Sequence, residues 1–172
     1  MTTAERRDLE DEYLDDEEDT LLGRYLTFSI ENRVCGIEVR DVIEIVGLPV
    51  VTEVPDMPEF VRGIINLRGK VIPVLDMRRR FLIASRDYDD RTCVVIVSLE
   101  GRLTGLIVDQ VREVVKISED NLEGSPRVGE GESSKFLKQV GKIGESVILI
   151  LDLERILNHK DAERLLETQG IN

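Results

Sequence analysis

The chain has 172 residues, of which 41% are hydrophobic and 34% charged, and its formal net charge is -12. This length allows one ordinary domain or two very small ones packed together. The longest apolar run, residues 147–151, is far too short to span a membrane, and the first residues lack the features of a signal peptide. We therefore expect a cytoplasmic protein without direct membrane insertion.

The first twenty residues carry most of the net charge. They contain ten acids and two bases, a net charge of -8. Such a segment repels itself and buries almost nothing, so we expect residues 1–23 to be an acidic, disordered arm, with a solvated helical turn as the alternative. Phosphate binding needs clustered Lys and Arg, so the charge also argues against nucleic-acid binding.

Residue types that carry metal or nucleophilic chemistry are scarce. His159 is the only histidine, and Cys35 and Cys93 lie in separate apolar runs, which we interpret as buried thiols. A zinc site or a catalytic triad would depend on that single histidine. The acidic residues 15–19 lack a calcium-type loop with its central glycine. We expect no cofactor, no metal ion and no enzymatic activity.

From Tyr25 onward, short runs of Val, Ile and Leu alternate with Gly, Asn and Pro, which is typical of strands and turns. Residues 25–39 predict one hairpin around Asn32, and residues 92–108 predict another around Gly101. The body of the protein is therefore predicted to be mainly β.

The two hairpins belong to an internal repeat. A shift of 69 positions aligns residues 25–46 with residues 94–115, and eight of the 22 positions are identical, where average composition gives about one or two. At a shift of 76, residues 71–77 match residues 147–153. The extra positions fall in the polar stretch 124–134, which predicts a loop.

A repeat of this size predicts two similar β subdomains, roughly residues 24–85 and 90–158, each too small to supply its own core. Closing each sheet into a barrel would protect the strand edges. Helices should be short, with Asp76 and Asp152 as their N-caps. A C-terminal amphipathic helix is predicted from Leu153 into the tail at 159–172, where it covers the core or, alternatively, binds a partner.

The richest motif lies between residues 54 and 76. Gly63 and Gly69 bracket a predicted strand and its turn, and Gly69 is placed to take a positive φ angle. Asn66 and Arg68 therefore lie at a hairpin tip. From spacing alone, Arg68 is equally compatible with a solvated turn arginine and with a functional residue.

Glu44 is a candidate partner for Arg68. It is the only carboxylate in the run 42–46, where alternation places the two isoleucines on one face and Glu44 with the two valines on the other. A carboxylate on a half-apolar face favours a cation as its partner. The guanidinium group of Arg68 can form a bidentate pair with it, although spacing alone cannot establish this contact.

Five segments, in this order, resemble the CheW family of bacterial chemotaxis coupling proteins: residues 42–45, 54–55, 63–69, 71–78 and 105–111. The match extends from about Tyr25 to Leu157 and includes the Asn-Leu-Arg-Gly turn. The resemblance implies a domain over residues 24–158, built from two intertwined five-stranded β-barrels of the Src-homology-3-like kind.

The resemblance also implies a function. Members bridge the cytoplasmic tip of a methyl-accepting chemoreceptor and the regulatory, CheW-like domain of a CheA-type histidine kinase, which would recruit this protein to receptor arrays at the inner face of the membrane. By motif, the implied partner-binding residues are Val42, Glu44, Gly63, Asn66, Arg68 and Gly69. One alternative is a CheW-like adaptor for pilus or second-messenger control. Another is an enzyme that uses Asp76 with Asp109 or Asp152, although capping and turns explain these aspartates.

Overall fold

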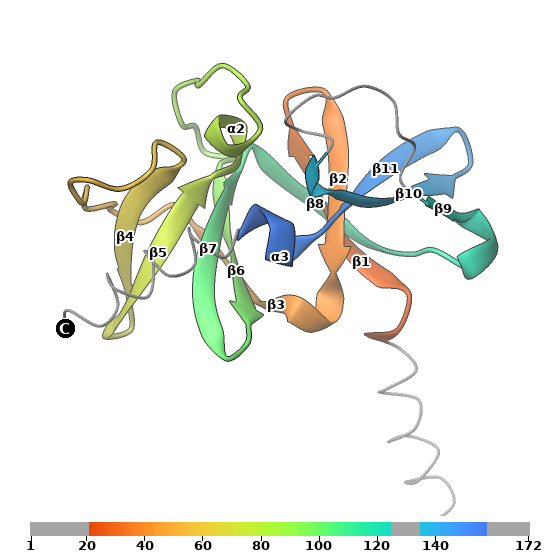
Figure 1. The fold of residues 1–172 in the computed structure, drawn as a ribbon, viewed down its shortest axis with the longest axis horizontal. Helices are drawn as coiled ribbons and strands as arrows, with labels where there is room; N and C mark the ends of the chain where they lie inside the picture. Colours follow the sequence, from red (N-terminus) through yellow and green to blue (C-terminus); the bar gives the residue numbers. More distant parts are fainter. Residues whose placement is uncertain (1–20, 125–134, 158–172) are drawn as a thin grey trace, which may run out of the picture.

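The computed structural model describes residues 21–124 and 135–157, which form strands with a few short helical turns (Figure 1). The described strands are β1 (Arg24–Ile30), β2 (Arg33–Glu38), β3 (Val42–Gly47), β4 (Val61–Leu67), β5 (Lys70–Asp76), β6 (Cys93–Leu99), β7 (Arg102–Val108), β8 (Gln110–Lys116), β9 (Leu122–Gly124), β10 (Leu137–Ile143) and β11 (Ser146–Leu151). The helical turns are η1 (Val39–Asp41), α2 (Met77–Arg80), η2 (Glu119–Asn121) and α3 (Leu153–Ile156).

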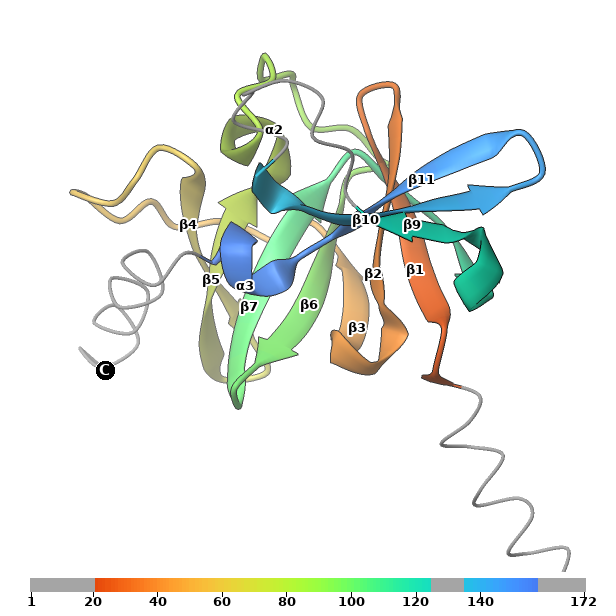
Figure 2. The same ribbon diagram turned by 45° about the vertical axis from the view of Figure 1, so that its right-hand side comes forward.

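These strands form two twisted sheets that lie side by side (Figure 2). The five-stranded sheet has the order β3-β6-β7-β5-β4, and the six-stranded sheet has the order β8-β1-β2-β11-β10-β9. Each contains one parallel pair, β5 with β7 and β2 with β11. The predicted mainly β fold is confirmed. The sixth strand, β9, has a one-residue counterpart in the other sheet, where Thr52 forms an isolated bridge with Ile64.

The chain passes between the two sheets twice. β1 and β2 belong to the six-stranded sheet, residues 42–108 supply the whole five-stranded sheet, and the chain returns at β8. The predicted division into residues 24–85 and 90–158 therefore separates the copies of the repeat but not the two sheets. The copies exchange their first hairpins: β1–β2 joins the strands of the second copy, and β6–β7 joins those of the first. This exchange is what intertwines the sheets.

The largest cluster of buried side chains lies between the sheets and takes residues from both, including Phe28 of β1 and Val95 of β6. Each sheet also encloses a smaller core of its own, around Ile72 in one and Ile150 in the other. Cys35 is buried, as predicted, but Cys93 is only half-buried because it begins β6 at the end of the sheet. The shared core joins the sheets into one packed unit.

The two predicted N-caps are confirmed. The Asp76 carboxylate accepts a hydrogen bond from the Arg78 amide at 3.0 Å, and the Asp152 carboxylate accepts one from the Arg155 amide at 3.3 Å. Leu153, Ile156 and Leu157 are buried, so the described start of the C-terminal segment covers the core. The part of the predicted C-terminal helix beyond residue 157, the acidic residues 1–20 and residues 125–134 of the predicted loop lie outside the described residues.

Candidate partner-binding surface

Arg68 and Gly69 form the tip of the β4–β5 hairpin. They are the two central residues of its turn, because Leu67 pairs with Lys70. Their φ angles are 51° and 86°, and two positive values in succession define the type I′ turn that suits the twist of a hairpin. The Asn66 side-chain oxygen accepts a hydrogen bond from the Gly69 amide at 3.0 Å. The positive φ angle of Gly69 is the one that the sequence predicted. The turn places the exposed Arg68 side chain at the end of the hairpin.

The predicted ion pair between Glu44 and Arg68 is present. Arg68 Nη2 donates to Glu44 Oε1 through a single hydrogen bond, not the bidentate pair that we expected. The Arg68 side chain is 72% exposed and that of Glu44 is 26% exposed. Since β3 and β4 are the two edges of the five-stranded sheet, this contact ties one edge to the hairpin of the other. The pair therefore lies at the seam where this sheet closes into a barrel.

Gly63 is part of the same seam, but it is buried. A Cβ atom at this position would lie 2.2 Å from the Thr52 carbonyl oxygen, so the backbone approach requires glycine. Thr52 and Ile64 exchange two backbone hydrogen bonds of 2.9 Å beside it. Gly63 can therefore shape the partner-binding surface but presents no side chain to a partner.

The exposed face of β3 is apolar. The predicted alternation is present, with Val42 and Glu44 half-buried, but the isoleucines are on the solvent side: Ile43 is 54% exposed and Ile45 is 41% exposed. β3 is also an edge strand, whose free backbone groups and apolar side chains can be covered by another chain. The family motif did not identify these isoleucines as partner-binding residues. Their alternation with Glu44 along the strand was the signal in the sequence that could have identified them.

The edge of the other sheet has a similar feature. β8 is the outer strand of the six-stranded sheet, and its Val114 side chain is 49% exposed. β3 and β8 each begin just after the chain passes from one sheet to the other. Both edges therefore offer apolar contacts near the junction between the sheets.

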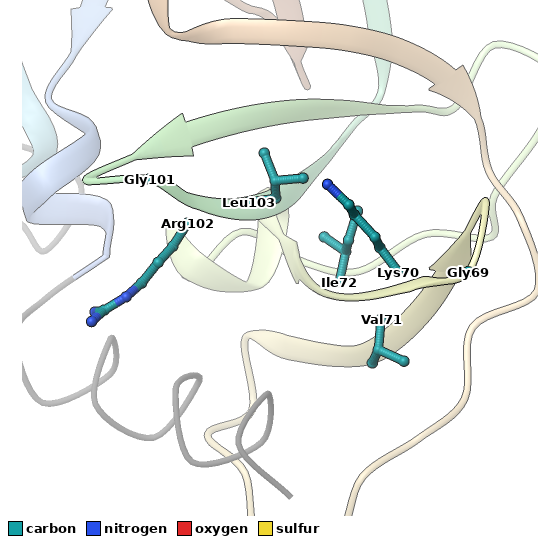
Figure 3. A pocket seen from close by; sticks show the side chains of 7 residues that line it. All are labelled: Gly69, Lys70, Val71, Ile72, Gly101, Arg102 and Leu103. Carbon is teal, nitrogen blue, oxygen red and sulfur yellow. The ribbon is translucent and has the colours of Figure 1, made fainter. Parts of the chain in front are cut away.

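A cavity of about 350 Å³ lies beside the Arg68 tip, between the β4–β5 and β6–β7 turns (Figure 3). Its lining residues are Gly69, Lys70, Val71, Ile72, Gly101, Arg102 and Leu103. The β6–β7 turn repeats the type I′ geometry, with φ angles of 53° at Glu100 and 78° at Gly101. Lys70 and Arg102 extend the positive charge of the Arg68 tip across both turns.

The carboxylates considered for an enzyme have structural partners. Asp76 caps α2 and accepts a hydrogen bond of 2.8 Å from the Tyr88 hydroxyl. Burial and the Asp76 carboxylate raise the pKa of Tyr88 to about 12, which keeps this hydroxyl protonated. Asp109 pairs with Arg78 at 2.8 Å, and Asp152 caps α3. These contacts account for all three aspartates without a catalytic role.

Two further findings limit the chemistry of the surface. Within residues 21–124 and 135–157, no group of three or more His, Cys, Asp or Glu side chains is arranged to hold a metal ion. None of the helices described in the structure is long and apolar enough to cross a membrane. What this part of the chain offers is a pair of apolar sheet edges, one of them next to an exposed arginine. These features make it a candidate surface for binding other proteins.

Residues 24–161 match the family of CheW-like domains, and the chain belongs to this family. A crystal structure of the scaffolding protein TtCheW from Thermoanaerobacter tengcongensis is similar, with a TM-score of 0.75 and 35% identity, over 81% of this chain and 94% of that one. The sequence resemblance is thereby confirmed, together with the two Src-homology-3-like barrels that it implied.

Relatives named chemotaxis protein CheW match at lower identity. The protein from Klebsiella aerogenes is 29% identical over 143 residues, which cover 83% of this chain and 86% of the relative. The protein from Treponema pallidum is 28% identical over 144 residues, which cover 81% and 85% of the two chains. The similarity thus extends over most of both chains in each comparison.

Proposed function

We propose that this protein is a chemotaxis coupling protein, an adaptor without catalytic activity. It links a CheA-type histidine kinase to methyl-accepting chemoreceptors and permits the receptors to control the kinase. Support comes from membership of the CheW-like domain family and from relatives named as chemotaxis and scaffolding proteins. The observation that carries the proposal is the exposed Arg68, held by Glu44 at the barrel seam beside the apolar face of β3.

The surface around β3 suits the apolar face of a receptor helical hairpin. Ile43 and Ile45 offer apolar area on an edge strand, and Arg68 adds a cation that can bind carboxylates or carbonyl groups at the rim. Glu44 limits the freedom of this arginine, which lowers the entropic cost of ordering it on binding. Val42, Gly63, Asn66 and Gly69 act indirectly by shaping the strand and the turn.

The second partner is the regulatory domain of the kinase, which itself resembles CheW. Two domains of one fold can associate end to end through exposed barrel edges, where apolar side chains meet free backbone groups. Simultaneous binding of kinase and receptor would place the protein in receptor arrays at the cytoplasmic face of the membrane. No nucleotide or metal ion enters this mechanism.

Calorimetric titrations with the two partners test the proposal. The purified protein is titrated against the kinase regulatory domain and, separately, against a soluble cytoplasmic receptor fragment, each time with a chelator present. We expect association with both. Ile45→Asp, on the exposed face of β3, should weaken receptor binding, whereas Val147→Asp, at a similarly exposed valine of β11, should not. The proposal would be contradicted if the protein failed to bind one of the two partners, or if binding depended completely on a divalent ion.

A further inference from the structure

The outer strands of the two sheets are equivalent in the repeat but differ in charge. At the shift of 69, β8 is the counterpart of β3, and the exposed positions of β3 are exposed in β8 as well. On β3 these positions are apolar or glycine, whereas on β8 two of the three are cations. The equivalent pairs are Ile43 and Arg112, Ile45 and Val114, and Gly47 and Lys116.

A third cation lies beside them at the start of β1. Arg24 is directly opposite Lys116 in the β1–β8 pairing, so the two side chains share one face of the sheet. The equivalent position of the other sheet pairs Gly47 with Cys93, two small residues. Like charges directly opposite each other destabilise a sheet, and a carboxylate between them would remove the repulsion. This pair of cations is therefore specific to the edge of the six-stranded sheet.

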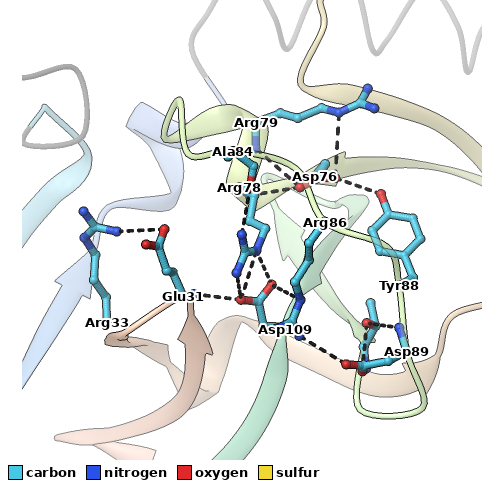
Figure 4. Close-up of polar contacts among 11 residues, drawn as sticks. Glu31, Arg33, Asp76, Arg78, Arg79, Ala84, Arg86, Tyr88, Asp89 and Asp109 are labelled. Atoms are coloured by element: carbon cyan, nitrogen blue, oxygen red, sulfur yellow. Dashed lines mark hydrogen bonds and ion pairs between the residues drawn. The ribbon is translucent and has the colours of Figure 1, made fainter.

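The guanidinium group of Arg24 lacks an acceptor at one buried atom. Its Nε atom is buried, and no residue among 21–124 and 135–157 accepts a hydrogen bond from it. By contrast, Nε of Arg78, whose side chain is 12% exposed, donates to the Asp109 carboxylate at 2.8 Å (Figure 4). A buried N–H group without an acceptor costs free energy, and carboxylates are strong acceptors for a guanidinium group. The site at Arg24 therefore favours an additional carboxylate.

The two cations of β8 are also available to an anion. Lys116 forms no ion pair within the part of the chain that the structure describes, and Arg112 donates a hydrogen bond of 3.2 Å to the Ser29 hydroxyl. Glu113 is the one acid of β8, so this strand and Arg24 together have a net charge of +2. Residues 21–172 as a whole have a net charge of -4, the difference between -12 and -8. The β8 edge is thus a basic patch on an acidic protein.

We propose that the acidic residues 1–20 bind these cations and cover the free edge of β8. The segment has a net charge of -8 and precedes β1, the strand that pairs with β8. Its five consecutive acids, residues 15–19, precede Arg24 by five to nine positions. Ten extended residues reach about 33 Å, whereas the distance from Lys116 to Arg112 along the strand is about 14 Å. Carboxylates of this segment can therefore reach all three cations.

Binding of this segment would make the two sheet edges unequal. β3 stays open, with Ile43 and Ile45 exposed, whereas any chain that pairs with β8 must first displace the acidic residues. Exposed ion pairs contribute little to stability, so the contact directs the segment without holding the fold together. It is a property of the isolated chain and does not depend on the proposed function. The alternative is that the cations are solvated and only keep other chains from pairing with the edge.

Paramagnetic relaxation in the full chain distinguishes these explanations. A nitroxide label is attached at Leu14→Cys, which leaves all ten acids of the segment in place. Cys93 is replaced by serine, while Cys35 can stay, because burial raises the pKa of its thiol to about 12. We expect strong relaxation enhancement at the amide of Val114 in low salt. The enhancement should fall at about 0.5 M salt, where the Debye length is only about 4 Å.

Two variants separate binding from the mere proximity of a tethered label. Arg112→Gln/Lys116→Gln removes both cations of β8, and we expect the enhancement at Val114 to fall by about threefold or more, the usual effect of losing two exposed ion pairs. The control Lys138→Gln/Lys142→Gln removes two exposed cations of β10 in the same sheet and should leave the enhancement unchanged. The amide spectrum of each variant shows directly that it is folded.

Three outcomes would overturn the proposal. Equal enhancement in the two variants, or enhancement that does not respond to salt, would show that the label is near β8 only because of its tether. Enhancement that increases with protein concentration would assign the acids on β8 to a second copy of the chain. Enhancement centred on β3 would place the acidic segment at the other sheet edge.

Discussion

Gly36 and Gly105 occupy the same position in the two sheets. Gly36 lies opposite Ile150 in the parallel pair β2–β11, and Gly105 lies opposite Val74 in the parallel pair β7–β5. These glycines are identical in the sequence repeat, and their partners are equivalent at the second shift. The absence of a side chain at each glycine leaves room for branched side chains inside each barrel.

The two glycines should differ in their tolerance to alanine. A Cβ atom on Gly105 would lie 2.6 Å from Val94 Cγ1 and 2.7 Å from Val74 Cγ1, whereas the nearest atoms to a Cβ on Gly36 are isoleucine carbons at 3.2 Å. Valine methyl groups are held by a stiff χ1 angle and cannot move aside easily. We expect Gly105→Ala to lower the free energy of unfolding by about 1–3 kcal/mol and Gly36→Ala by less. Urea denaturation of both variants measures the difference, and equal losses would contradict it.

Arg68→Glu should prevent receptor-coupled kinase activation without unfolding the protein. The reversed charge would lie next to Glu44 and repel the carboxylates or carbonyl groups of a partner. We expect a loss of about 2 kcal/mol or more in binding, at least about tenfold in affinity. Folding should change by less than about 1 kcal/mol, because exposed ion pairs contribute little. The measurements are kinase activation in a reconstituted receptor array and thermal melting by circular dichroism.

A matched exposed ion pair provides the control for this prediction. Lys142 pairs with Glu123 at 2.6 Å in the six-stranded sheet, and both side chains are more than half exposed. Lys142→Glu should leave receptor binding unchanged. Normal activation by a folded Arg68→Glu variant would remove this arginine from the site, and an unfolded variant would assign it a structural role.

The ion pair at Asp109 predicts a pH-dependent contribution to stability. Burial raises the pKa of Asp109, but the hydrogen bonds from Arg78 and from the Glu31 amide, with the charges of Arg78 and Arg86, outweigh it and hold the pKa below its usual 3.8. The contribution is therefore fully present above the unfolded-state pKa and disappears as the pH falls through the folded-state value. We expect Asp109→Asn to cost about 2–4 kcal/mol at neutral pH and progressively less in acid.

Chemical denaturation of both proteins between pH 7 and about pH 2.5 checks this expectation, because the range extends below the usual carboxylate pKa. The curves of unfolding free energy against pH should converge at the acid end. A constant difference at every pH would show that the Asp109→Asn substitution disturbs the packing and that the charge of Asp109 contributes nothing.

Deletion of residues 1–20 should leave the fold intact. The segment has a net charge of -8 and few apolar side chains, so it can contribute little buried area. We expect the unfolding free energy of the truncated protein to lie within about 2 kcal/mol of the full chain. Thermal melting of the two proteins side by side is the measurement. A larger loss would show that these residues pack against the domain.

Local patterns in the sequence were sufficient to predict much of this protein. Alternation and turn residues identified the two hairpins, the caps at Asp76 and Asp152 and the glycine turn at Arg68, because each depends only on neighbouring residues. The spacing of repeated residues identified the two copies. Glu44, the only carboxylate in an otherwise apolar run, could be named as a candidate partner for Arg68, but spacing alone could not establish their contact.

The tertiary structure alone decided where the hairpins pair and which faces are buried. Both copies of the repeat have the same strand pattern, so a hairpin fits its own copy or the other one equally well by local criteria, and only the packed sheets select the exchange. Alternation likewise assigned Ile43 and Ile45 to one face of β3, but the position of that strand at a sheet edge determines that this face meets solvent. The Arg78–Asp109 contact has the same origin: the residues are 31 positions apart, and the parallel pairing of β5 with β7, in which Asp76 lies opposite Ile107, brings them together.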